Sequence, residues 1–69
     1  MAKLLNDQVA RILDVLYMNA PGEPDWSAVR EAIFTAGASP SLIIEILRVL
    51  WLYAEDPSAF EDYLLSIKE

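Results

Sequence analysis

Apolar residues recur along this chain at helical spacing, which predicts a compact all-α bundle of about four short helices. We expect helices over residues 3–19, 25–37 and 39–54, and a last one from residue 56 onward. Capping residues, prolines at first helical positions and a glycine at one end set these limits. Outside the third helix, the predicted inward positions are Leu5, Val9, Ile12, Leu13, Leu16, Trp26, Val29, Ile33, Ala36, Phe60, Tyr63, Leu64 and Ile67.

The third predicted helix, residues 39–54, is apolar almost all round. Ser41, Glu45 and Arg48 share one narrow strip of the helical wheel with Leu52. A small domain covers one face of a helix, so a helix that is apolar on several faces implies a second body. The predicted inward side chains are Ile43, Ile46, Leu47, Leu50 and Ala54, with Leu42, Val49 and Tyr53 on one flank and Ile44 and Trp51 on the other.

The length of 69 residues predicts a single helical domain over residues 1–69, near the size at which one core barely stabilises a fold. Oligomerisation is a common remedy at that size. The chain has no cysteine and no histidine, which excludes disulfides and thiol chemistry. Its 55% hydrophobic content excludes disorder.

The charge balance is acidic, with five Lys and Arg against eleven Asp and Glu and a net charge of −6. Nonspecific attraction to phosphate backbones or anionic membranes is therefore disfavoured. No unbroken apolar segment follows Met1, so we expect no signal peptide. The longest apolar run, residues 46–54, contains Arg48 and is shorter than the roughly 20 residues that span a bilayer. We expect a soluble, cytoplasmic protein.

Residues 32–47 resemble the helix-turn-helix of lac-type bacterial repressors. That pattern has a small residue in its first helix, Ala-Gly at the turn, a capping serine, and Val-x-x-Val-Leu in the recognition helix. The matching residues are Ala32, Ala36, Gly37, Ser39, Ile43, Ile46 and Leu47. The resemblance implies a helix-turn-helix-like corner, in which small residues let two helices approach and the aliphatic side chains bury the second helix.

The positions that read DNA in that family depart from its pattern. The family exposes polar and basic residues there, whereas this chain has Pro40, Ser41, Leu42, Ile44 and Glu45. Arg48 is the one basic residue of the predicted helix. Because DNA binding draws much of its strength from neutralising phosphates, nucleic acid is a disfavoured partner.

Other chemistry is sparse. Asp7 and Asp14 can share a helix face, yet no third ligand or nucleophile stands at motif spacing, and we interpret them as a solvated face. We therefore predict no enzyme, no cofactor and no metal site. Trp26 is expected in the core, while Trp51 is either packed against the first helix or an interface anchor, since tryptophan is enriched at binding hot spots.

The leading hypothesis is a small acidic regulator or inhibitor that binds a protein with a basic or apolar groove and blocks one of its surfaces. Such a partner could be a bacterial regulatory or nucleic-acid-binding protein, and a phage-type antagonist of a host protein fits the pattern. We also predict a homodimer. The alternatives are a helix-turn-helix DNA-binding regulator and a structural subunit of a larger complex. The predicted interface is Leu42, Ile44, Glu45, Arg48, Val49, Trp51, Leu52 and Tyr53. One flank of the helix would make the dimer, and the other would meet the partner.

Overall fold

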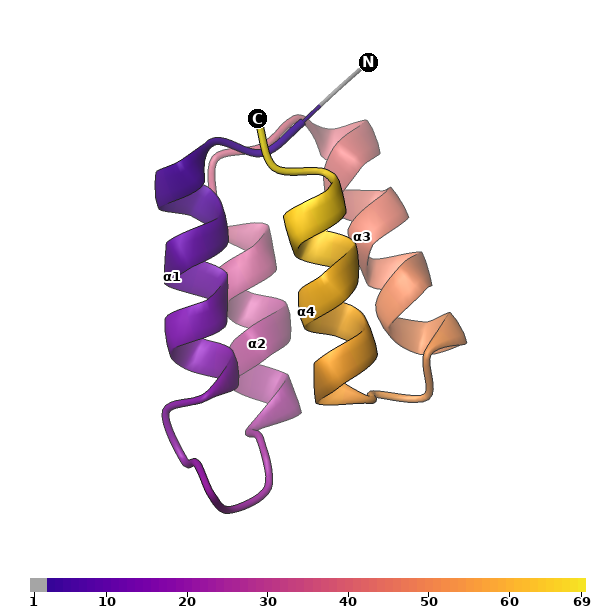
Figure 1. Ribbon diagram of the computed structural model, residues 1–69. Coiled ribbons are helices and arrows are strands. Elements are labelled where there is room, and N and C mark those ends of the chain that lie inside the picture. Colours follow the sequence, from indigo (N-terminus) through magenta and orange to yellow (C-terminus); the bar gives the residue numbers. More distant parts are fainter. Residues whose placement is uncertain (1–2) are drawn as a thin grey trace.

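The computed structural model describes residues 3–69, which form an all-α bundle of four helices (Figure 1). Their bounds are α1 Asn6–Leu16, α2 Trp26–Phe34, α3 Pro40–Leu52 and α4 Pro57–Ser66. Each helix runs opposite to the one before it, so α1 begins and α4 ends at the same end of the molecule. The predicted fold class is confirmed.

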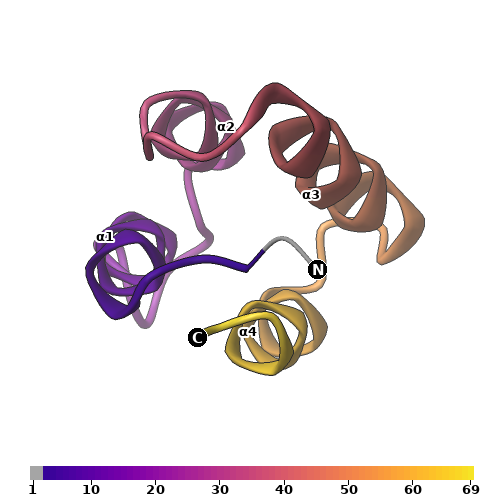
Figure 2. The same ribbon diagram turned by 90° about the horizontal axis from the view of Figure 1, so that it is seen from above.

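Seen from above, the helices stand in a ring in chain order around one shared core, with α3 tilted relative to the others (Figure 2). α1 packs against α2 and α4, and α2 also packs against α3. The buried core consists of Leu4, Val9, Ile12, Leu16, Val29, Ile33, Ala36, Leu42, Ile46, Leu50, Phe60 and Leu64. Every helix therefore contributes one apolar stripe to the same interior.

The predicted helix caps are in place. The Asp25 carboxylate accepts from the backbone N–H of Ala28 at 3.2 Å, and the Ser39 hydroxyl accepts from that of Leu42 at 3.4 Å. Asp56 caps α4 in the same way, with a proline in the first turn. These side chains satisfy amides that lack partners within their helices, which explains why the starts of α2, α3 and α4 could be read from the sequence.

The first helix is shorter than predicted, Asn6–Leu16 rather than 3–19. Leu5 was expected inside, but it lies before the helix and is exposed, whereas Leu4 is fully buried. Leu4 is extended and pairs with the end of the chain: its N–H donates to the Ile67 carbonyl at 3.0 Å, and its carbonyl accepts from Glu69 at 2.8 Å. Alternate residues of extended backbone point to opposite sides, which turns Leu5 outward.

The corner between α2 and α3 depends on Gly37 and on a distant side chain. Gly37 has φ +85°, in the left-handed region that favours glycine. The carbonyl of Ala36, one residue earlier, accepts from the Gln8 side-chain amide at 2.9 Å. The same Gln8 side chain accepts from the N–H of Leu5 at 2.8 Å. The Gln8 side chain thus connects the start of α1 to the corner between α2 and α3, which sets the direction of α3.

The turn between α3 and α4 departs from the sequence prediction. Ala54 was expected inside α3, but the helix ends at Leu52 and Ala54 is exposed with φ 52°. Glu55 is also left-handed, with φ 59°. The chain reverses through these residues so that Asp56 can cap α4, and this removes Ala54 from the inward stripe.

Replacing Gly37 with alanine tests the corner. A Cβ at Gly37 would meet Gln8 Nε2 at 3.6 Å, which is ordinary contact, so the cost is that of the left-handed backbone alone. We expect Gly37→Ala to lower the free energy of unfolding in urea by about 1 kcal/mol. The matched control is Ala54→Gly, which relieves a left-handed alanine and should not destabilise the protein. Equal stability of Gly37→Ala and wild type would contradict this account.

A second prediction concerns alkaline pH. The Tyr17 hydroxyl of the α1 end donates to the Glu61 carboxylate on α4, and this hydrogen bond, with partial desolvation and the negative charge of Glu61, raises the pKa of Tyr17 to about 12. A raised folded-state pKa stabilises the fold below the unfolded value near 10, and that contribution is lost as the pH rises from 10 to about 12. Urea unfolding across this range should therefore show a steeper loss of stability in wild type than in Tyr17→Phe. Parallel curves would contradict the prediction.

Candidate protein-binding surface

The inward stripe of α3 differs from the prediction. It consists of Leu42, Ile46 and Leu50, with Ile43 and Leu47 half-buried beside it. At 100° per residue, this stripe is rotated by about 50° from the predicted one. The reason is the place of α3 in the ring between α2 and α4, because the stripe must face both neighbours.

This rotation removes one predicted flank from the surface. Leu42 is 3% exposed and belongs to the core, so its assignment to an interface is wrong. Val49 is half-buried. Tyr53 is partly exposed, and its ring meets the Tyr63 ring of α4 edge-on at 6.4 Å between centroids. The flank of Leu42, Val49 and Tyr53 is thus largely engaged inside the protomer.

The opposite flank of α3 lies in water. Trp51 is 83% exposed, Leu52 69% and Ile44 59%. Glu45 and Arg48 are exposed between these side chains, as the sequence predicted. Trp51 therefore does not pack against α1, and of its two predicted places the outer one is observed. Trp26, by contrast, is half-buried against the core as expected.

Phe34 of α2 extends this apolar area, and the sequence analysis missed it. It is 61% exposed. A shallow groove of about 300 Å³ joins it to α3, lined by Arg30, Phe34, Leu47, Leu50, Trp51 and Glu55. Phe34 directly follows the buried Ile33, so helical spacing places it outside the inward stripe of α2. Its exposure could therefore have been predicted from the sequence. We call Phe34, Ile44, Leu47, Arg48 and Trp51 the α2–α3 face.

Two arginine and two glutamate side chains lie at the α2–α3 face, and one arginine and one glutamate form an ion pair. The Arg30 guanidinium lies 3.1 Å from the Glu55 carboxylate, and both side chains are exposed, which limits the pair to a small contribution to stability. Arg48 and Glu45 are three residues apart, yet Arg48 has no ion-pair partner within 4.0 Å among residues 3–69. The guanidinium of Arg48 therefore stands beside exposed apolar side chains with its hydrogen-bond donors open to solvent.

A buried polar atom of α4 lies on the side of that helix that faces Tyr53, at the end of α3. The hydroxyl oxygen of Tyr63 is inaccessible to solvent and has no hydrogen-bond partner within residues 3–69. Desolvation raises the pKa of Tyr63, and the charge of Glu45 and the neighbouring Tyr53 raise it further. The Tyr63 ring also stacks on the buried Phe60 at 6.4 Å between centroids. The ring contacts of Tyr63 stabilise the packing between α3 and α4, which we call the α3–α4 seam, whereas burial of its unpaired hydroxyl lowers the stability of the fold.

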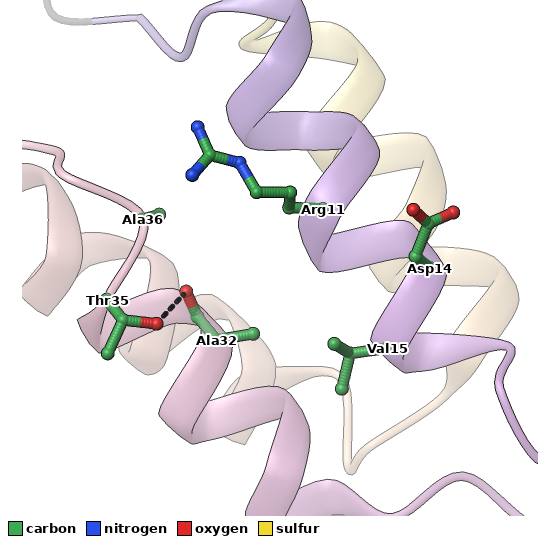
Figure 3. Close-up of a pocket in the computed structure, with 6 residues that line it drawn as sticks. All are labelled: Arg11, Asp14, Val15, Ala32, Thr35 and Ala36. Carbon is green, nitrogen blue, oxygen red and sulfur yellow. Dashed lines mark hydrogen bonds between the residues drawn. The ribbon is translucent and has the colours of Figure 1, made fainter.

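A second pocket, of about 330 Å³, lies between α1 and α2 and is lined by Arg11, Asp14, Val15, Ala32, Thr35 and Ala36 (Figure 3). Two of its polar groups are engaged locally: the Arg11 Nε donates to the Asp7 carbonyl at 3.3 Å, and the Thr35 hydroxyl donates to the carbonyls of Glu31 and Ala32 in α2. Asp7 does not line this pocket. The carboxylates of Asp7 and Asp14 therefore do not converge there on a common site.

In the part of the chain that the structure describes, no group of three or more potential metal ligands gathers. None of its helices is long and apolar enough to cross a membrane.

Comparison of the chain with protein-family models, with curated proteins and with solved structures finds no match. The resemblance of residues 32–47 to lac-type repressors stays a prediction. The geometry of the α2–α3 face is accordingly the basis for the functional argument.

The Tyr63 hydroxyl gives a test of the α3–α4 seam. Replacing it with hydrogen in Tyr63→Phe keeps the ring contacts and removes a buried group without a partner. We expect the free energy of unfolding in urea to rise by about 1 kcal/mol. The control is Tyr17→Phe, which removes a hydrogen bond that is made and should not stabilise the protein at neutral pH. A loss of stability in Tyr63→Phe would mean that the hydroxyl has a partner.

Proposed function

We propose that this chain is a small acidic regulator that acts by protein–protein contact through the α2–α3 face. The observation that carries the proposal is the 83% exposure of Trp51 beside the exposed Phe34, at a groove between two helices. Tryptophan and arginine are the residue types most enriched at binding hot spots, and Arg48 stands one turn from Trp51. Contiguous apolar patches of this kind usually mark an interaction site.

The kind of partner follows from the two chemistries of the surface. The α2–α3 face fits an apolar groove or an apolar helix on the partner. The acidic residues elsewhere, which give the chain its net charge of −6, suit a partner with a basic rim and speed encounter with it. A regulatory or nucleic-acid-binding protein in the cytoplasm has such a surface, and an inhibitor that covers it, of the kind phages use against a bacterial host, is the function we favour.

The same charges weigh against direct reading of DNA. The exposed flank of α3 presents Ile44, Glu45 and Trp51 where a recognition helix would present polar and basic groups. This flank offers apolar contact area to a partner protein, whereas it offers only one arginine to neutralise the phosphates of a nucleic acid. These side chains favour protein binding over a helix-turn-helix DNA-binding regulator, and we propose no separate role as a structural subunit.

Affinity capture tests the proposal. Tagged wild-type protein should retain a specific protein from a lysate of the native host, identified by mass spectrometry, and Trp51→Ala should retain at least tenfold less of it. Because Trp51 is mostly in water, the variant should keep its helical circular dichroism and unfolding midpoint. The matched control is Met18→Ala, an exposed apolar residue away from the α2–α3 face, which should capture normally.

Two results would contradict the proposed function. One is equal capture by wild type, Trp51→Ala and Met18→Ala, which would place the interaction elsewhere. The other is tight, sequence-dependent binding of duplex DNA that Arg48→Ala abolishes, which would favour the helix-turn-helix alternative.

A further inference from the structure

We propose that a second copy of this chain occupies the α2–α3 face, with the two α3 helices packed antiparallel, and that this homodimer hides the surface used for the partner. The dimer stands on the structure alone, while the competition with a partner rests on the proposed function.

The exposed flank of α3 is a single one. The sequence left open which flank of α3 would dimerise, and in the structure Leu42 is in the core and Val49 is half-buried. The flank of Ile44 and Trp51 is therefore the more exposed apolar surface through which two α3 helices can associate. Two molecules cannot cover that flank at once, so a dimer formed there excludes the partner.

The residues of this flank are spaced symmetrically. Ile44 and Trp51 are seven residues apart on one stripe, with Leu47 and Arg48 in the turn between them. We place a two-fold axis perpendicular to the two α3 helices, midway between positions 47 and 48, which makes the helices antiparallel. Ile44 of each copy then lies opposite Trp51 of the other copy. Such an interface is closed and self-complementary, the commonest symmetry of soluble homo-oligomers.

The charges fit the same axis. Glu45 and Arg48 lie on one edge of the flank, and in an antiparallel two-fold pair this edge faces the same edge of the second copy. Glu45 and Arg48 of opposite copies are then offset by about 3 Å along the helix axis, within reach of an ion pair. The two pairs formed across the dimer give Arg48 the carboxylate that it does not meet within residues 3–69 of its own chain.

Charge also selects this face over others. Arg30 and Arg48 balance Glu45 and Glu55 around it, so the excess of acidic residues lies on the rest of the molecule. Two copies with a net charge of −6 repel each other in other orientations. One 13-residue helix and the edge of α2 make a small interface, about 1,200 Å² or less in total, so we expect a dimer that dissociates on dilution.

Sedimentation velocity on the full chain, from about 1 to 200 µM, tests the proposal. Wild type should shift reversibly from the mass of one chain to that of two. Trp51→Ala should stay monomeric over the same range, whereas Leu65→Ala, an exposed apolar residue on α4, should dimerise like wild type. Trp51 emission should move to shorter wavelength as the dimer forms, and Trp51→Phe should remove that shift.

Charge reversal tests the geometry. Glu45→Arg and Arg48→Glu should each weaken dimerisation at least tenfold, and the double variant Glu45→Arg/Arg48→Glu should restore it, because the two ion pairs re-form in the opposite sense. These side chains are exposed, so helical circular dichroism should persist in all three. Failure of the double variant to recover would overturn the antiparallel pairing.

The outcomes separate this inference from the proposed function. A wild-type monomer at 200 µM, or a dimer unaffected by Trp51→Ala, overturns the inference, and capture of a partner would still be measurable in that case. A dimer with the expected variant pattern supports the inference even if the capture experiment finds no partner, a result that would count against the proposed function alone.

Discussion

The excess of apolar surface on α3 over what one core can cover is the constraint on which the rest of the structure depends. The helix is apolar on most of its circumference, and the ring of helices takes one stripe of it, Leu42, Ile46 and Leu50. Burial of each such side chain is worth roughly 1.5–3 kcal/mol. The stripe that faces inward therefore stabilises the fold, while the flank of Ile44 and Trp51 stays in water and is available for association.

The orientation of α3 decides which residues fall on each side, and it is set at the corner. Gly37 supplies the left-handed residue, and Gln8 holds the carbonyl of Ala36 from 28 residues away in sequence. Because the connection from Ala36 to the Ser39 cap is so short, α3 has little freedom to rotate about its axis. The contact that Gln8 makes from the start of α1 thus helps to fix the corner at which α3 begins.

Local patterns explain why the helices themselves could be predicted. Asp25, Ser39 and Asp56 cap by hydrogen bonds to amides two or three residues away, so the information lies in short segments. Leu4 and Leu5 could not be sorted in the same way, because the pairing of Leu4 with Ile67 and Glu69 spans the whole chain. The prediction of which α3 residues face inward was wrong for a similar reason. The sequence of a helix that is apolar on most sides does not indicate which side is buried, and the packing of the neighbouring helices decides it.

The candidate site was predictable to the extent that it is local. Ile44, Glu45, Arg48, Trp51 and Leu52 share one side of a helix, and their exposure follows from helical spacing once one position is fixed. The groove to Phe34 required the packing of α2 against α3.

Acidity and the apolar face act together. A monomer that leaves Trp51 and Phe34 in water would associate in many ways if its surface were neutral. The net charge of −6 opposes approach from most directions, whereas the ion pair Arg30–Glu55 and the opposite charges of Arg48 and Glu45 reduce that barrier at the α2–α3 face. The charges thus contribute little to the strength of a contact and much to its geometry. For the association that we propose, that division of roles would let so small a chain keep apolar side chains exposed and still be selective in what covers them.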